Sequence, residues 1–170
     1  MSTCINIKGA KMSEQHRHYD SNDAGPEWGT PGYIWKPLAA ALNGFDLDPA
    51  SGAETEPIAE HLYTKKDDGL SKPWFGDVWL NPPYGREFNE KWAAYAHEQA
   101  EREPVRTLTA LVPAATDTQW FQHHYAHAEW LTFIEGRIEF DGAGDHPASF
   151  ASVLCTWGAV PHAYMSALNA

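Results

Sequence analysis

Hydrophobic positions follow a helical period and then a strand period near the start of the patterned region. Thr30-Pro31 predicts a helix start, with Thr30 as the capping hydroxyl and Pro31 as the first helical residue. Apolar residues then recur at helical spacing until Asn43-Gly44, which predicts the helix end. Residues 45–48 alternate apolar and acidic side chains and stop at Pro49, which predicts a short strand.

The same reading predicts the remaining elements. Residues 52–62 are weakly helical, residues 77–80 form a strand, and residues 87–103 form a helix. The nearly continuous apolar run at residues 106–112 is typical of a central strand covered on both faces. A helix capped by Thr116 follows at about residues 117–127, and three further strands are expected at residues 130–134, 138–140 and 150–156.

This order of elements predicts an α/β fold with an open, mostly parallel sheet and an antiparallel hairpin at its end. Residues 28–160 are expected to form a single catalytic domain. Residues 1–27 carry little apolar periodicity and are interpreted as a partly flexible N-terminal arm, and residues 161–170 as a C-terminal tail.

Composition narrows the class of protein. The chain has 170 residues, of which 43% are hydrophobic, so it can bury a core without disulfides or a structural metal. No apolar run approaches the length of a membrane span, and the first residues lack an export signal, so we expect a cytoplasmic protein. The net charge of −11 argues against indiscriminate nucleic-acid binding. The first 18 residues lean positive, which leaves a local basic face open, but a solvated, partly disordered arm is the preferred interpretation.

Neither the cysteines nor the histidines predict a metal centre. Cys4 and Cys155 lie at opposite ends of the chain without a Cys-x-x-Cys spacing, and we expect both to be reduced. His123 and His127 are spaced as a helical metal pair, but no His-Glu-x-x-His pattern accompanies them.

Candidate chemistry gathers directly after three predicted strands. Ligands of open α/β sheets lie outside the carboxyl ends of the strands, so residues at these positions are candidates for a binding or catalytic site. They carry Asp48-Pro49-Ala50-Ser51-Gly52, Asn81-Pro82-Pro83-Tyr84 and Pro113-Ala114-Ala115-Thr116-Asp117.

The segment Asn81-Pro82-Pro83-Tyr84 resembles the catalytic tetrapeptide of S-adenosylmethionine-dependent amino methyltransferases. An exocyclic adenine amine is a poor nucleophile because its lone pair is delocalised into the ring. Acceptance of its hydrogens by the Asn81 oxygen and the Pro82 carbonyl would aim that lone pair at a methyl donor. Pro82 and Pro83 would stiffen the loop, and Tyr84 would stack on a base taken out of the duplex.

The resemblance extends over about residues 28–156. Shared segments include Thr30-Pro31, residues 45–51, Tyr63-Thr64 with residues 67–70, residues 79–84, residues 111–114, and Gly136-Arg137-Ile138 with Phe140. In this spacing the chain is similar to the phage-type DNA N6-adenine methyltransferase family. The resemblance implies a minimal Rossmann-like class I methyltransferase, phage- or prophage-borne, that uses S-adenosylmethionine to methylate adenine in DNA.

The resemblance also implies a cofactor site. Asp48 would contact the amino-acid end of S-adenosylmethionine, with Pro49, Ala50 and Ser51 shaping the turn around it. Thr30 and Pro31 would support its methionine side. Asp68 is assigned to the adenosine part, although Asp67-Asp68-Gly69 is also a good surface turn.

The chain is short for this class. Asn81 lies only 33 positions after Asp48 (81 − 48), too few for two full βα units, which leaves the ribose and adenine contacts open. There is no room for a separate recognition domain, so site choice would come from loops, the arm, a homodimer or another protein. Candidates for phosphate contact are Lys65, Lys66, Arg86 and Arg137; for each, a solvated surface cation is the alternative.

Two other functions stay open. The same tetrapeptide serves RNA-base and protein-glutamine methylation, and the acidic charge favours such acceptors. A non-catalytic acidic interaction module on the same fold is the second alternative, and the intact Asp48 and Asn81 argue against it.

Overall fold

The computed structural model describes residues 29–52, 56–142 and 147–168. The predicted N-terminal arm at residues 1–27, with Cys4, lies outside this part of the chain. The first helix, α1, spans Gly32–Leu42 and ends at Asn43, whose left-handed backbone (φ 62°) brings its N–H to the last helical carbonyls, as predicted. Thr30 does not cap α1: the residue before the first helical residue is Pro31, whose carbonyl accepts from the Ile34 N–H.

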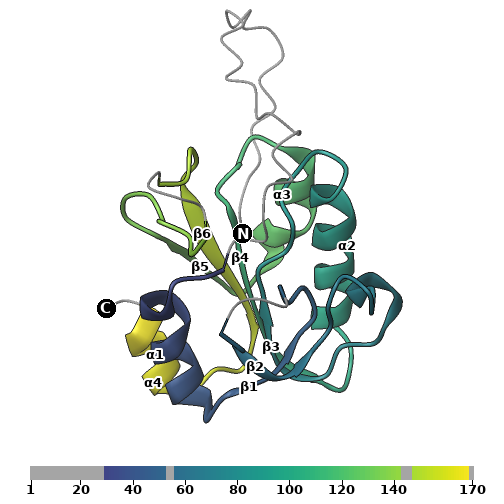
Figure 1. Cartoon of the computed structure of the whole chain (residues 1–170), viewed down its shortest axis with the longest axis vertical. Helices are drawn as coiled ribbons and strands as arrows, with labels where there is room; N and C mark the ends of the chain where they lie inside the picture. The colour runs from purple at the N-terminus through teal and green to yellow at the C-terminus, as the bar shows by residue number, and fades with distance from the viewer. Residues whose placement is uncertain (1–28, 53–55, 143–146, 169–170) are drawn as a thin grey trace, which may run out of the picture.

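A mixed sheet forms the centre of the molecule (Figure 1). Among the described residues it contains β1 (Phe45–Asp48), β2 (Ala59–Leu62), β3 (Gly76–Leu80), β4 (Val105–Pro113), β5 (Trp130–Phe133) and β6 (Ser152–Gly158), in the order β2-β1-β3-β4-β6-β5. The first four pair in parallel, whereas β6 runs antiparallel to both β4 and β5. The prediction of a mostly parallel α/β sheet with an antiparallel pair near its end is confirmed.

Helices cover both faces of this sheet. On one face lie α2 (Asn89–Ala100), α3 (Gln119–His123) and the short helix η2 (Tyr125–His127), and on the other lie α1 and α4 (His162–Leu168), side by side (Figure 1). Another short helix, η1, spans Gly69–Ser71. The segment assigned to a C-terminal tail contains α4, whose buried Tyr164 hydroxyl bonds to Thr109 of β4.

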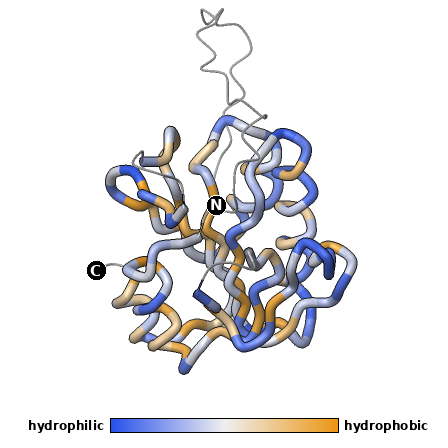
Figure 2. The backbone as a smooth tube through the Cα atoms, viewed as in Figure 1, coloured by the Kyte–Doolittle hydropathy of each residue, from blue (hydrophilic) through white to orange (hydrophobic). Residues whose placement is uncertain are grey.

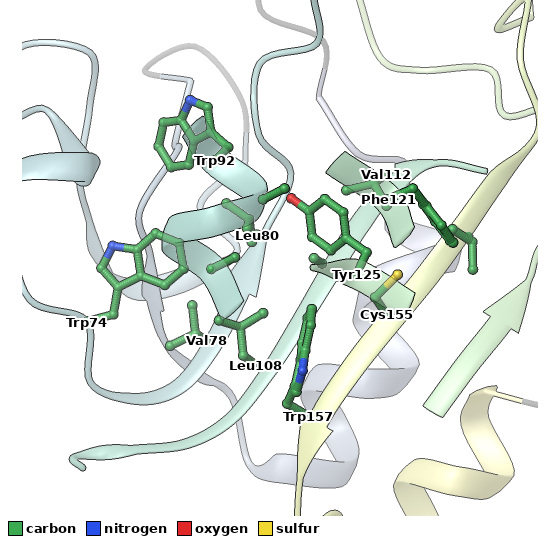
Figure 3. Packing of buried hydrophobic residues seen from close by; sticks show 14 of the residues in the cluster. Trp74, Val78, Leu80, Trp92, Leu108, Val112, Phe121, Tyr125, Cys155 and Trp157 are labelled. Carbon is green, nitrogen blue, oxygen red and sulfur yellow. The ribbon is translucent and has the colours of Figure 1, made fainter. Parts of the chain in front are cut away.

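The two faces of the sheet carry separate hydrophobic clusters. One joins β3, β4 and β6 to α2, α3 and η2, and Figure 3 shows Tyr125 in the middle of its labelled side chains. The second joins Trp79, Leu111 and Leu154 to α1 and α4. Hydrophobic residues accordingly follow the central strands, while the peripheral turns are mostly hydrophilic (Figure 2). Burial on both faces explains the continuous apolar run recognised in β4.

Four local predictions are wrong. Residues 59–62 form β2 instead of part of a weak helix, because they pair in parallel with β1 and this pairing decides over weak propensity. Residues 138–140 are not a strand, although Ile138 and Phe140 are buried against the α1 face. The helix expected at residues 117–127 breaks at His124 into α3 and η2, and its capping side chain is Thr118 instead of Thr116.

An ion cluster ties together the amino ends of the parallel strands. The Arg106 guanidinium lies 2.6 Å from an Asp46 carboxylate oxygen and 2.5 Å from one of Asp77. Asp46 also accepts the Asp77 backbone N–H at 2.7 Å, and Thr107 donates to Asp77. A Cβ at Gly76 (φ 68°) would stand 2.3 Å from the Asp46 carboxylate, so glycine is required there. The carboxyl ends of these strands, by contrast, carry the candidate chemistry.

The part of the chain that the structure describes contains no helix long and apolar enough to span a membrane.

Candidate active site

The carboxyl ends of β1, β3 and β4 meet at one edge of the sheet. Leu47 of β1 pairs with Val78 of β3, and Leu80 at the end of β3 pairs with Ala110 of β4. Asp48 is the last residue of β1 and Asn81 directly follows β3, so two of the three predicted segments leave adjacent strands at this edge. The third leaves β4 after Pro113.

Asp48, the last residue of β1, is a buried acid with only 6% of its surface exposed. Its Oδ1 accepts the Ala50 backbone N–H at 3.0 Å, and its backbone carbonyl accepts from the Tyr63 N–H. Burial raises the pKa of the Asp48 carboxyl from 3.8 to about 7, and the Ala50 hydrogen bond offsets only part of this effect. No ion pair to Asp48 is found within the described residues. The site is therefore electrostatically prepared for a cation.

The loop after Asp48 packs against Gly69, the first residue of η1. A Cβ built on Gly69 would stand 2.0 Å from the Pro49 carbonyl oxygen, so only glycine permits this approach. The Trp74 indole donates to the Gly69 carbonyl at 2.9 Å, and Gln99 of α2 accepts the Trp74 backbone N–H at 3.0 Å. The loop is thus connected to α2 through the Gly69 contact and two buried hydrogen bonds, which the sequence did not predict.

Asp67 and Asp68 have different environments. Asp67 accepts from the Thr64 hydroxyl and backbone N–H and pairs with Lys72 at 3.0 Å; these bonds lower its pKa to about 2. Asp68 is exposed and left-handed (φ 54°), and its backbone carbonyl accepts from Ser71. Asp67 therefore organises the turn, whereas Asp68 is an exposed residue directly before Gly69.

Thr30 and Pro31 are both buried, just before α1. The Thr30 hydroxyl makes no hydrogen bond to any residue in the described ranges. A buried hydroxyl without a partner is costly and uncommon, so this atom is available to a ligand. Ser51 is also buried, and its backbone N–H bonds to the Tyr63 carbonyl, so the turn after Asp48 is fixed to the residue after β2.

The tetrapeptide after β3 is held against β4. The Tyr84 hydroxyl donates to Asn81 Oδ1 at 2.6 Å, and the Leu111 carbonyl oxygen lies 3.1 Å from the same hydroxyl. The Tyr84 ring meets Phe140 and Phe150 edge-on, with centroids 6.2 and 5.4 Å away. Pro82 is buried and Pro83 is exposed. The two phenylalanines were not predicted as site residues; each is far from Tyr84 in sequence.

The candidate phosphate-binding cations are all exposed: Lys65, Lys66, Arg86 and Arg137. Arg86 lies two residues after Tyr84, and Lys65 and Lys66 lie in the turn after β2. Arg137 follows Gly136 in the segment that leads to Phe140. Their positions are compatible with nucleic-acid contact, which stays a prediction.

Histidine and cysteine form no metal centre in the described ranges. His97 of α2 stacks on His127 with ring centroids 5.2 Å apart, but no group of three or more His, Cys, Asp or Glu side chains there could hold a metal ion. Cys155 is free and buried in β6, and burial raises the pKa of its thiol well above the ordinary value.

Comparison with known proteins agrees with this geometry. A family model described as DNA N-6-adenine-methyltransferase (Dam) matches residues 19–156. A protein of Escherichia phage T1 named DNA N-6-adenine-methyltransferase is 30% identical over 149 residues, which cover 86% of this chain. The match covers 59% of the phage protein, so the chain spans about three fifths of that relative. With four fifths of its residues matched by the family model, the chain belongs to the DNA N-6-adenine-methyltransferase (Dam) family.

Proposed function

We propose that this protein transfers a methyl group from S-adenosylmethionine to N6 of adenine in DNA. The observation that carries the proposal is the placement of Asn81 at the carboxyl end of β3, next to the strand that ends in the buried Asp48. An amide that can hold an amine and a carboxylate that can hold a cation thus leave neighbouring strands. Family membership and the similarity to the phage T1 protein support the same activity.

The residues on β1 and before α1 fit the cofactor. S-adenosylmethionine, when bound, supplies an electrophilic methyl group on a sulfonium. The buried Asp48 carboxylate would bind its ammonium group, and the Thr30 hydroxyl, which has no partner among the described residues, would donate to its carboxylate. Pro31, Pro49, Ala50 and Ser51 would form the surrounding walls. Asp68, exposed beside this loop, is proposed for the adenosine hydroxyls.

The tetrapeptide residues act on the target adenine. Asn81 Oδ1 and the Pro82 carbonyl would accept the two N6 hydrogens, while Tyr84 offers its ring to the flipped base. Held in this way, the N6 lone pair would face the methyl group that the cofactor would supply. The amine then releases one proton to solvent, so no dedicated general base is required.

DNA affinity would come from local cations on an otherwise acidic chain. Arg86, Lys65, Lys66 and Arg137 would contact phosphates. We propose DNA as the partner and a homodimer as one source of additional DNA-binding surface. A phage or prophage origin, like that of the Escherichia phage T1 relative, is part of this proposal, as is a cytoplasmic location.

The test is methyl transfer from labelled S-adenosylmethionine to unmethylated genomic DNA, followed by digestion to nucleosides and mass identification. We expect N6-methyladenine, and we expect Asn81→Ala to slow its formation about a hundredfold to a thousandfold, a rate that single-turnover assays still measure, while calorimetric cofactor binding persists. Label in RNA or protein but not in DNA would transfer the proposal to the RNA-base or glutamine alternative. Absence of any cofactor binding by the intact chain would favour a non-catalytic interaction module.

A further inference from the structure

The Tyr84 hydroxyl occupies an unexpected position for a residue whose anticipated role is stacking. It donates to Asn81 Oδ1, the same oxygen that the proposed chemistry assigns to the adenine amine. Building on the proposed function, we infer that the Tyr84 hydroxyl positions the Asn81 amide for catalysis, separately from any role of the Tyr84 ring.

The hydrogen-bond distances support this assignment. The hydroxyl has one proton and two acceptors within reach, Asn81 Oδ1 at 2.6 Å and the Leu111 carbonyl at 3.1 Å. The shorter distance is typical of a good O–H···O bond, so the proton is directed to Asn81. An amide oxygen has two lone pairs, and this bond uses one of them. The second is the lone pair that the proposed function assigns to an amine hydrogen, and the bond from Tyr84 sets its direction.

An asparagine side chain needs such a restraint. Its terminal torsion is broad, so without a partner the oxygen and the NH₂ group can exchange places. If the NH₂ group of Asn81 faced the target, two donors would meet and the amine would be repelled. A hydroxyl that donates to the amide favours the rotamer in which the oxygen, and not the NH₂ group, faces that hydroxyl.

Tyr84 is itself fixed from two sides. Phe140, with 3% of its surface exposed, and Phe150 meet its ring edge-on, and the backbone of β4 supplies the Leu111 carbonyl beside its hydroxyl. The hydroxyl that donates to Asn81 is therefore anchored by the sheet and by an aromatic group. This geometry meets the requirement that a catalytic group be held by a rigid surrounding shell.

The test is a double-mutant cycle with Tyr84→Phe, Asn81→Ala and the double variant, measured by single-turnover methylation of an adenine-containing duplex. Tyr84→Phe keeps the ring and removes only the hydroxyl. We expect it to lower the transfer rate about tenfold to a hundredfold, the range for a misplaced catalytic group. In the Asn81→Ala background the same change should have no further effect, because the group that the hydroxyl positions is already gone.

Two readouts separate this role from a general loss of structure. Binding of S-adenosylmethionine by calorimetry and fluorescence of a 2-aminopurine placed at the target position should both be unchanged in Tyr84→Phe. The matched control is Tyr95→Phe in α2, which removes a hydroxyl that donates to the Lys72 carbonyl. This control should leave the transfer rate unchanged.

Each other outcome overturns the inference in a distinct way. A wild-type rate in Tyr84→Phe would show that the hydroxyl has no role. An equal loss in both backgrounds would show that it acts independently of Asn81. Weaker cofactor binding and altered 2-aminopurine fluorescence would show a structural role. If the wild-type protein methylates no adenine, the proposed function fails together with the inference, whereas active wild type with unchanged Tyr84→Phe refutes the inference alone.

Discussion

The buried carboxyl of Asp48 should make the protein less stable as pH rises, and Asp48→Asn should remove that effect. The pKa of this group is raised from 3.8 to about 7 by burial, so folding favours its protonated form. Well below pH 3.8 the group is neutral in both states and costs nothing. Between about pH 4 and 7 the folded state progressively loses stability relative to the unfolded chain, and above pH 7 the full cost persists.

The size of this effect follows from the shift. About three pKa units at about 1.4 kcal/mol each correspond to about 4 kcal/mol at pH 8 and about 1–2 kcal/mol at pH 5. Asparagine is nearly the same size as aspartate. Its amide oxygen accepts a hydrogen bond from the Ala50 N–H at least as well as a neutral carboxyl group does. The variant should therefore exceed the wild type in free energy of unfolding by up to about 4 kcal/mol at pH 8.

Urea unfolding of both proteins at pH 5 and pH 8, without ligand, measures this difference. The same variant should lose calorimetric binding of S-adenosylmethionine, because it cannot supply a negative charge to the ammonium group. A stability difference that is equal at both pH values would refute the titration argument. Retained cofactor affinity would refute the placement of Asp48 in the cofactor site.

Three other substitutions test the support of the site and the core. Gly69→Ala should weaken S-adenosylmethionine binding at least about tenfold in calorimetry, because the new Cβ would displace the Pro49 carbonyl 2.0 Å away. Tyr125→Phe should raise the free energy of unfolding by about 1 kcal/mol in urea titrations, because it removes a fully buried hydroxyl that has no partner in the described ranges. Arg106→Met should lower that free energy by about 1–2 kcal/mol and leave methylation unchanged, because Asp77 loses its cation at the edge opposite the site.

The matched control for Gly69→Ala is Gly32→Ala, whose Cβ would meet only the flexible end of Lys36. Equal cofactor affinity in both variants would contradict the proposed support of the Pro49 loop. A destabilised Tyr125→Phe would mean that the hydroxyl has an energetic role after all. Loss of methylation in a folded Arg106→Met would contradict the separation of the two edges.

The strands at the centre of the fold were predictable because their surroundings leave a direct mark on the sequence. β4 is covered on both faces and is mostly apolar, and β1 alternates because its Asp46 side chain reaches the ion cluster. The sequence of β2 shows no clear strand pattern, because its residues are partly exposed and its pairing with β1 determines its conformation. Burial was equally misleading at residues 138–140, where apolar side chains cover α1 without pairing in the sheet.

Within the site, chemistry was easier to predict than support. Asn81 and Asp48 follow strands directly, so their common edge follows from a parallel sheet. The groups that hold them come from distant segments: Phe140 and Phe150 beside Tyr84, and Gln99 behind the Pro49 loop. Only tertiary packing brings such groups together, and neither periodicity nor spacing records it.

Unsatisfied polar groups alone do not locate a site in this protein. The hydroxyl of Tyr125 and the indole N–H of Trp157 are both buried without a partner in the described part of the chain, yet they lie within an apolar cluster. Thr30 and Asp48 differ because an orphaned hydroxyl precedes α1 and a buried acid ends β1, where the proposed cofactor needs both an acceptor of its ammonium and a donor to its carboxylate. If this reasoning is correct, S-adenosylmethionine should raise the melting temperature of Tyr125→Phe as much as that of the wild type, and that of Thr30→Ala by clearly less. Equal ligand-induced shifts in all three proteins would mean that the Thr30 hydroxyl is one more unsatisfied core group and not part of the site.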